Sequence, residues 1–383
     1  MWLLAIVPTL ALLVFTAEVW LGIASTRAIE ITGETPGICI LIPAHNEASI
    51  IVQTLERLRP LISSTTRALI VADNCSDNTA ELVREQEFPV IERFDTEQRG
   101  KGFALAFGHD HLRSNPPDCI IVMDADCHTD PQAISDLARK SCSARAATQA
   151  RYIFDPAHVA SPKVQISNFA LWIKNVVRQR GSARLGGAAV LTGTGMAFPW
   201  HLFERMPLAT GSIVEDLSLT VDLTLARDAP LFLDQALVLS DAAGEQATLG
   251  QRSRWEHGFL AVAGSYGLPL VRHGLFQLDR RALLLGLHLL VPPFALLIML
   301  CVFMTALLAG GAVLTGNWSP FAVLATSFAT ALLGVLVNWA LEGRAWLQPK
   351  ALLFFPVYIL WKIPLYARFL VGKRAGWTRT ERE

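Results

Sequence analysis

Two carboxylates, Asp124 and Asp126, stand one residue apart where the apolar segment 119–123 ends. Charges of one sign at that spacing repel each other. A Mg²⁺ or Mn²⁺ ion would offset the repulsion, because hard cations prefer oxygen ligands, and Mg²⁺ often completes its shell with substrate phosphates. The pair therefore predicts a metal–diphosphate site. The plainer alternative is a turn in which one carboxylate caps the backbone and the other is solvated, with His128 a surface residue.

A second acidic pair, Glu215 and Asp216, opens the amphipathic segment 212–223. Acids are favoured at a helix N-terminus by the macrodipole, which is reason enough for their presence. The chemical interpretation makes Asp216 a general base that takes the proton of an attacking hydroxyl, with Glu215 increasing its basicity through like-charge coupling.

Two basic segments accompany these acids. In "RGKG" (99–102) the glycines allow close backbone approach to a ligand, so Lys101 either contacts a phosphate or base, or lies in a simple turn before a helix. In "QRSRW" (251–255) Arg254 offers a planar fork for a diphosphate and Trp255 a flat face for a sugar. An Arg/Trp belt at a membrane interface explains the second segment equally well.

Alternating strand-like and helix-like segments must position these residues. Asp130 is the expected N-cap of one helix with Pro131 at its first position, and Ser76 or Asp77 is the expected cap of an earlier helix. The alternation predicts a mostly parallel sheet covered by helices, with ligands at the carboxyl ends of the strands. The expected strands are 37–43, 67–74, 89–94 and 119–124, and the expected helices are 46–60, 76–86, 100–113 and 130–140.

Composition excludes several classes of protein. The 383 residues include 33 basic and 33 acidic ones, which argues against nucleic-acid binding, since that needs a basic excess. Neither a G-x-x-x-x-G-K-[ST] loop nor, after the first strand, a G-x-G-x-x-G turn is present. Six cysteines without a C-x-x-C pair predict reduced, buried thiols. A hydrophobic fraction of 52% indicates a membrane protein.

The apolar residues gather in four runs. The first lacks a basic leading region and contains Glu18, so we expect a transmembrane helix within residues 1–25 and not a cleaved signal peptide. The runs 283–310, interrupted by two prolines, and 321–341 are further spans, and the short run 351–367 is expected to be interfacial or re-entrant. Flanking cations predict a cytosolic catalytic domain at the inner or plasma membrane: Arg252, Arg254, Arg272, Arg280, Arg281, Lys373, Arg374, Arg379 and Arg382.

In order along residues 36–260, the motifs resemble those of membrane-bound family 2 glycosyltransferases, especially bacterial exopolysaccharide members: "PAHNE", "ADNCSDNTA", "RGKG", "DAD", "GTGMAF", "VED" and "QRSRW". Cellulose, chitin and hyaluronan synthases and ceramide glucosyltransferase are related. The resemblance implies an α/β, Rossmann-like GT-A fold and inverting transfer. The expected parts are a helix at 1–25, the GT-A domain at 36–245, an interfacial segment at 246–282, and a membrane domain with a basic cytosolic tail at 283–383.

The resemblance also implies roles at matching positions. Asp216 would be the catalytic base beside Glu215, and Asp126 with Asp124 would bind Mg²⁺ or Mn²⁺. Donor contacts would come from Pro43, Ala44, Glu47, Asp73, Lys101, Asp124, Asp126 and Arg254. The acceptor site would be formed by Gly193, Thr194, Gly195, Met196, Gln251 and Trp255.

The expected reaction moves a hexose or N-acetylhexosamine from a UDP-sugar to a membrane-held, lipid-linked saccharide in exopolysaccharide or cell-surface glycan synthesis. Three spans are fewer than processive synthases carry, which favours single or limited transfer. The alternatives are a ceramide or diacylglycerol glucosyltransferase, or a processive β-glycan synthase. A non-catalytic assembly subunit is disfavoured because the four motif acids are present: Asp73, Asp124, Asp126 and Asp216. Membrane lipid and other polysaccharide-assembly proteins are expected partners.

Overall fold

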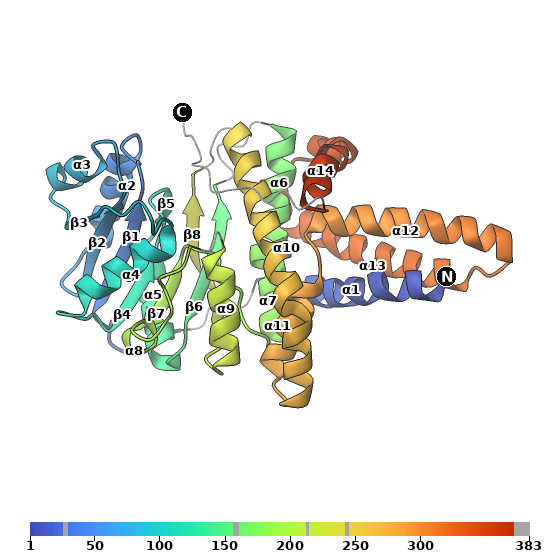
Figure 1. Ribbon diagram of the computed structural model, residues 1–383, viewed down its shortest axis with the longest axis horizontal. Coiled ribbons are helices and arrows are strands. Elements are labelled where there is room, and N and C mark those ends of the chain that lie inside the picture. The colour runs from blue at the N-terminus through green and yellow to red at the C-terminus, as the bar shows by residue number, and fades with distance from the viewer. Residues whose placement is uncertain (26–29, 156–160, 212–213, 242–244, 371–383) are drawn as a thin grey trace.

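The computed structural model describes residues 1–25, 30–155, 161–211, 214–241 and 245–370. An α/β layer, an upright helix pair and a bundle of apolar helices follow one another along the long axis of the molecule (Figure 1). The basic residues expected in the cytosolic tail, from Lys373 to Arg382, lie outside the described residues.

The first half of the chain forms the parallel part of the sheet. Its strands are β1 (Ile38–Ala44), β2 (Thr66–Asp73), β3 (Val90–Arg93) and β4 (Cys119–Val122), linked by parallel pairing in the order β3-β2-β1-β4. The connecting helices are α2 (Ile51–Leu58), α3 (Thr79–Glu85), α4 (Lys101–Leu112) and, after β4, α5 (Pro131–Ala144). The strands and helices expected here are therefore confirmed.

The second half makes the sheet mixed, although four of its seven strand pairings are parallel, as the expectation of a mostly parallel sheet requires. β7 (Met196–Pro199) pairs antiparallel with β4, and the order continues β7-β6-β8-β5 with β6 (Thr148–Phe154), β8 (Leu231–Ser240) and β5 (Cys127–Thr129). Because β7 runs opposite to β4, the residues that precede β7 lie beside the carboxyl end of β4. This topology brings the loop 192–195 next to Asp124.

Two helix starts test the expected caps. Asp130 caps α5 as expected, its carboxylate accepting a hydrogen bond from the Ala133 N–H at 2.8 Å. The expected cap of α3 is wrong by one or two residues, because Asn78 holds the N-cap position and makes no side-chain bond. Asp77 instead accepts from the Thr79 N–H at 3.1 Å, so it closes a local turn before the helix.

A further set of helices packs between the sheet and the apolar bundle. α6 (Pro162–Trp172) continues through a π-helical turn (Ile173–Val177) into α7 (Arg178–Arg184), and α9 (Glu215–Leu225) carries the second acidic pair. Between the sheet and the bundle stand α10 (Glu245–Phe276) and α11 (Arg280–Leu290) (Figure 1). α8 (Trp200–Phe203) is a single turn after β7.

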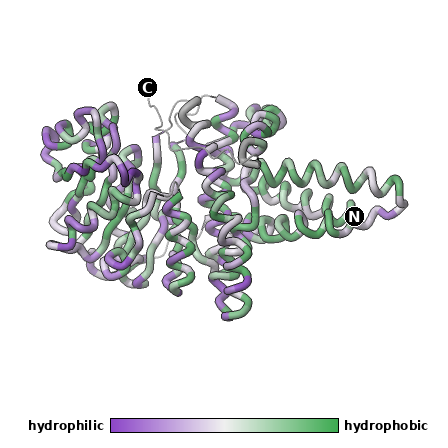
Figure 2. Tube along the Cα trace, in the orientation of Figure 1, coloured by the Kyte–Doolittle hydropathy of each residue, from purple (hydrophilic) through white to green (hydrophobic). Residues whose placement is uncertain are grey.

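The apolar bundle consists of α1 (Trp2–Leu21), α12 (Phe294–Thr315) and α13 (Ser319–Leu341), side by side and hydrophobic along their length (Figures 1 and 2). Leu3 is 83% and Leu314 87% exposed, as expected of a surface that faces lipid. The expected span at 283–310 is corrected to α12, because Pro292 and Pro293 separate α11 from it.

By length and composition alone, four helical segments could cross a membrane, and the fourth is Pro349–Ala367. It includes most of α14 (Phe355–Leu370), which Figure 1 shows nearly end-on while α1, α12 and α13 run across the view. α14 therefore runs at a steep angle to the bundle. The interfacial interpretation of this segment stays a prediction.

Candidate active site

Lys101 joins Asp124, the first acid of the D-x-D pair, to the loop before β7. Its ammonium donates hydrogen bonds to the Asp124 carboxylate and to the Gly193 carbonyl, the latter at 2.6 Å. Asp126 instead accepts from the Ser240 hydroxyl at 3.1 Å. Burial lowers the pKa of Lys101, but Asp124 and Glu215 outweigh it and raise that pKa overall. Lys101 therefore already offsets part of the negative charge at the end of β4.

The donor set at this strand end fits a hard divalent cation. One oxygen of Asp124, one of Asp126 and the Cys127 sulfur lie within 4.8 Å of one another. Burial raises the pKa of the Cys127 thiol well above its usual range, so this sulfur stays protonated and is a poor ligand. The two carboxylates remain as ligands of the kind that Mg²⁺ and Mn²⁺ prefer.

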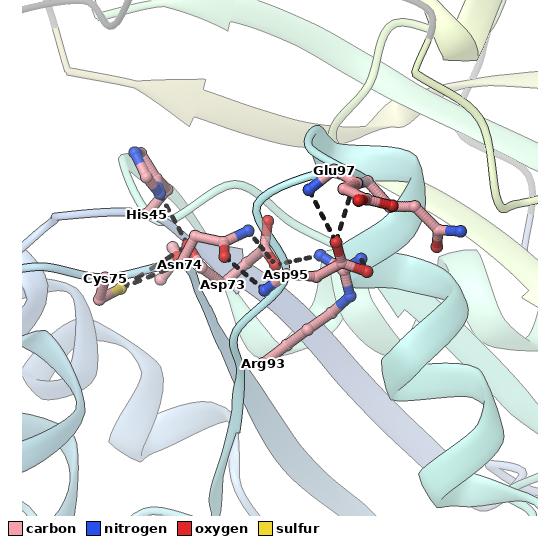
Figure 3. A network of polar contacts seen from close by, with 9 residues as sticks. His45, Asp73, Asn74, Cys75, Arg93, Asp95 and Glu97 are labelled. Atoms are coloured by element: carbon pink, nitrogen blue, oxygen red, sulfur yellow. Dashed lines mark hydrogen bonds and ion pairs between the residues drawn. The ribbon is translucent and has the colours of Figure 1, made fainter.

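The first cavity, the donor cleft, has a volume of about 790 Å³ and lies over the carboxyl ends of β1 and β2. Its walls include predicted donor residues: Pro43, Ala44, Glu47, Asp73, Lys101 and Asp124. Figure 3 shows the network beneath it. Arg93 donates to the Asp73 carboxylate at 2.7 Å and to Asp95 at 3.1 Å, and His45 Nδ1 lies 2.7 Å from the Asp73 carbonyl. These bonds fix the cleft floor before any ligand arrives.

Residues that the sequence interpretation passed over also line the donor cleft. Phe94 is 70% exposed directly after β3, and Thr96 and Arg99 follow it. An exposed ring at the carboxyl end of a strand can stack on a flat ligand such as a base. The sequence could have indicated Phe94, because this residue ends the predicted strand 89–94 at the edge of the sheet where ligands bind.

The second cavity, the acceptor pocket, has a volume of about 460 Å³ and meets the donor cleft at Lys101 and Asp124, which line both. It brings together residues far apart in the sequence: Gly193, Glu215, Asp216, Gln251, Arg254 and Trp255. Gly193 has φ +84°, and its Cα hydrogen points into the space between Asp216 and Lys101, so a Cβ there would lie 3.4 Å from each. The predicted base and the predicted donor lysine therefore face one backbone position.

Other predicted site residues lie behind these walls. Met196 is 2% exposed and belongs to the core beneath the sheet, and Gly195 packs against Val238. Thr194 is fully buried, and its hydroxyl accepts from the Asp124 N–H at 3.1 Å. Neither these three residues nor Asp126 are among the described residues that line the donor cleft or the acceptor pocket. Thr194 thus supports Asp124 from below.

Gln149 of β6 fixes the loop before β7. Its side chain is 1% exposed, accepts from the Thr192 N–H at 3.0 Å and donates to the Thr194 carbonyl at 3.0 Å. A buried amide that satisfies two backbone groups holds a loop in one conformation. No sequence pattern marked Gln149, because its partners lie about 45 residues away, in the loop before the antiparallel neighbour β7.

The acidic pair of α9 is more than ordinary helix-end charge. Burial and, after it, the neighbouring Asp216 raise the pKa of Glu215 to about 8. Burial also raises the pKa of Asp216, opposed by Lys174 and by the hydrogen bond from the Leu217 N–H at 2.7 Å. A carboxyl pair with raised pKa values facing a pocket is suited to proton transfer.

Comparison with known proteins fits this geometry. Residues 39–200 match the model of glycosyl transferase family 2. The chain contains a family 2 glycosyltransferase domain. The domain has relatives in the probable glycosyltransferase YdaM of Bacillus subtilis (36% identity over 107 residues, 26% of this chain and 25% of the relative) and the poly-beta-1,6-N-acetyl-D-glucosamine synthase of Staphylococcus aureus (30% over 123 residues, 31% and 28%).

The matches span about a quarter of the length of these curated relatives. Among solved structures, this chain is similar to the mannosyltransferase PcManGT of Pyrobaculum calidifontis, determined with GDP-Man and Mn²⁺. The TM-score is 0.55 at 19% identity, over 88% of this chain and 99% of that one. The likeness shows a shared GT-A fold, as the motifs implied.

Proposed function

We propose that this family 2 glycosyltransferase is an inverting enzyme that transfers a hexose or N-acetylhexosamine from a UDP-sugar to a membrane-held, lipid-linked saccharide. One observation carries the proposal: Lys101 and Asp124 stand where the donor cleft meets the acceptor pocket, and Glu215 and Asp216 line the latter. A sugar whose diphosphate lay at Asp124 would present its anomeric carbon toward Asp216.

In the proposed step Asp216 takes the proton of an acceptor hydroxyl in the acceptor pocket. The hydroxyl oxygen forms a bond to the anomeric carbon while the bond from that carbon to the UDP oxygen breaks. Attack from the face opposite UDP turns an α-linked donor into a β-linked product. Lys101 and Arg254 offset the charge on the departing diphosphate. Mg²⁺ or Mn²⁺ bound by Asp126 and Asp124 would supply further positive charge there.

Four apolar helices and the exposed leucines of the bundle favour a membrane enzyme with its catalytic domain at the cytosolic face. The relative named poly-beta-1,6-N-acetyl-D-glucosamine synthase supports a place in exopolysaccharide or cell-surface glycan synthesis. Three helices in the bundle, with α14 across them, favour limited transfer over synthesis of a long polymer.

A donor panel tests the function. Full-length protein in lipid nanodiscs receives UDP-glucose, UDP-galactose, UDP-N-acetylglucosamine or GDP-mannose with Mn²⁺, and nucleotide release is measured with and without added membrane lipid extract. We expect release from one UDP-sugar, stimulated by the extract and abolished by a chelator. Nucleotide release only from GDP-mannose would contradict the proposed UDP-sugar donor. Nucleotide release that a chelator does not reduce would contradict the proposed role of Mg²⁺ or Mn²⁺.

A further inference from the structure

A third cavity, the lipid-side cavity, lies between the catalytic domain and the apolar helices. Its aromatic walls come from α1, α12 and α14 on one side and from α10 on the other: Phe15, Phe294, Phe355, Tyr358, Trp255 and Phe259. Most of its surface is therefore hydrocarbon or ring carbon. Such walls suit methylene or isoprene units, and the cavity volume of about 90 Å³ gives room for a short stretch of such a chain.

Four charged residues also line the lipid-side cavity, and two of them are already neutralised. Arg178 donates to Glu18 at 2.5 Å, and Glu256 accepts from Lys362 at 2.7 Å. The remaining two are the cations Arg252 and Lys174. The cavity thus combines apolar walls with two cations that make no close ion pair with the described residues, although Asp216 and Glu256 act on Lys174 from farther away.

Arg252 is 5% exposed yet short of hydrogen-bond acceptors. Its Nη2 donates to Asn168 at 3.1 Å, while Nε and Nη1 have no partner among the described residues. The guanidinium lies 4.3 Å from the Phe154 ring centre and 4.8 Å from that of Trp255, which holds it in place. Buried donors without acceptors are costly, and an anionic ligand would satisfy them.

Lys174 links the lipid-side cavity to the acceptor pocket, since it lines both, together with Leu171, Trp255 and Phe259. It lies in the π-helical turn, a feature frequent at functional sites. In the described part of the chain its ammonium forms no close ion pair, and its one ring contact is Phe259 at 5.9 Å. A headgroup at Lys174 would therefore stand at the entrance to the pocket of Asp216.

We infer that the lipid-side cavity binds the acceptor as an amphiphile, with a hydrocarbon chain against the aromatic walls and a phosphate or diphosphate headgroup on Arg252 and Lys174. The inference rests on the proposed function and gives its acceptor class: the anion anchors the lipid, and the attached sugar hydroxyl reaches Asp216. Charge complementarity favours this occupant over a neutral glycolipid such as a ceramide, whose headgroup would leave Arg252 unpaired.

Binding without donor tests the inference. Full-length protein in phosphatidylcholine nanodiscs is titrated with labelled farnesyl phosphate and, in parallel, farnesol, which has the same chain without the anion. Since a hydrogen bond to a charged group contributes about 1.5–3 kcal/mol, we expect roughly tenfold or more tighter binding of the phosphate. Arg252→Met and Lys174→Met should each reduce the preference for farnesyl phosphate over farnesol about tenfold.

The matched control is Arg272→Met, which removes an exposed arginine from the same helix and should leave the preference unchanged. UDP binding by each variant shows that the fold is intact. Equal binding of farnesol and farnesyl phosphate, or full preference in both variants, would overturn the inference. So would displacement of farnesyl phosphate by equimolar phosphatidylglycerol, which would assign the cavity to ordinary membrane lipid. Failure of the donor panel leaves this binding result unaffected, so the two proposals fail separately.

Discussion

At the scale of single residues, Glu215 gives a pH dependence with a definite sign. Burial and Asp216 raise its pKa from 4.5 to about 8, while Lys101 opposes them and Asp124 adds to them. Between those values the Glu215 carboxyl is ionised in the unfolded chain and protonated in the folded protein. The free energy of unfolding therefore falls as pH rises from about 4.5 to 8. The effect is about 1–3 kcal/mol once partial solvent access is allowed for.

Glu215→Gln should therefore flatten the dependence of the melting temperature on pH in this range. The measurement is thermal unfolding of the purified protein in detergent at pH 5 to 8. Glu204→Gln, a change at an exposed glutamate, is the control. A variant with the same pH slope as wild type would show that Glu215 ionises normally.

Gly193→Ala tests the junction between the cavities. A left-handed φ of +84° costs a residue with a Cβ about 1–2 kcal/mol, and the methyl would lie 3.4 Å from Asp216 and Lys101. We expect kcat to fall about tenfold or more with the KM for donor nearly unchanged. Gly186→Ala, at φ +77° beside Arg280, is the matched control and should retain kcat. Equal losses in both variants would point to general strain instead.

Residue types were predictable from the sequence, whereas their partners were not. The spacing of Asp124, Asp126 and Asp216 within known motifs predicted where acids would gather. The Lys101–Asp124 ion pair and the unpaired guanidinium of Arg252 depend on how α4 and α10 pack against the sheet, which no local pattern specifies. Both arginines stand in "QRSRW", but the sequence interpretation assigned the diphosphate to Arg254 alone.

At the scale of elements, α1 joins the catalytic domain through a buried polar contact. Glu18 accepts from Arg178 at 2.5 Å and lies 2.7 Å from His288, and a Cβ on Gly181 would meet the Glu18 carbonyl at 1.9 Å. The close approach of α1 and α7 therefore requires glycine. The predicted membrane helix α1 is thus also a docking element of the catalytic domain.

Glu18→Leu should destabilise the protein by about 3–5 kcal/mol, because it leaves Arg178 buried without its counter-ion. The readout is the denaturation midpoint in detergent. Adding Arg178→Met should restore much of the loss, since the uncompensated charge is then gone. No recovery in the double variant would mean that packing, and not charge, explains the effect.

Element prediction succeeded where the periodicity was strong. The first four strands form where alternation and apolar runs placed them, whereas short β7 and β5 depend on antiparallel partners distant in the chain. The boundary of α12 was missed because the apolar run continues from α11, and only the two prolines separate α11 from the longer apolar helix.

At the scale of the whole molecule, three cavities follow one another from the outer edge of the sheet to the apolar helices. The donor cleft meets the acceptor pocket at Lys101, and the acceptor pocket meets the lipid-side cavity at Lys174. A soluble donor and a lipid acceptor can thus approach the acids of α9 from opposite sides. The sequence predicted a donor site on the sheet and apolar helices at the other end of the molecule. It did not predict the connected cavities between them, which arise from the packing of α10.

The central claim is that Asp216 is the base of an inverting sugar transfer. The most direct test compares wild type with Asp216→Asn, measuring both UDP-sugar binding and the rate of transfer to a lipid-linked acceptor. The account predicts unchanged donor affinity and a rate lower by about 10²–10⁴-fold, with a β-linked product from wild type. Transfer at the wild-type rate by Asp216→Asn, or an α-linked product from an α-linked donor, would contradict it.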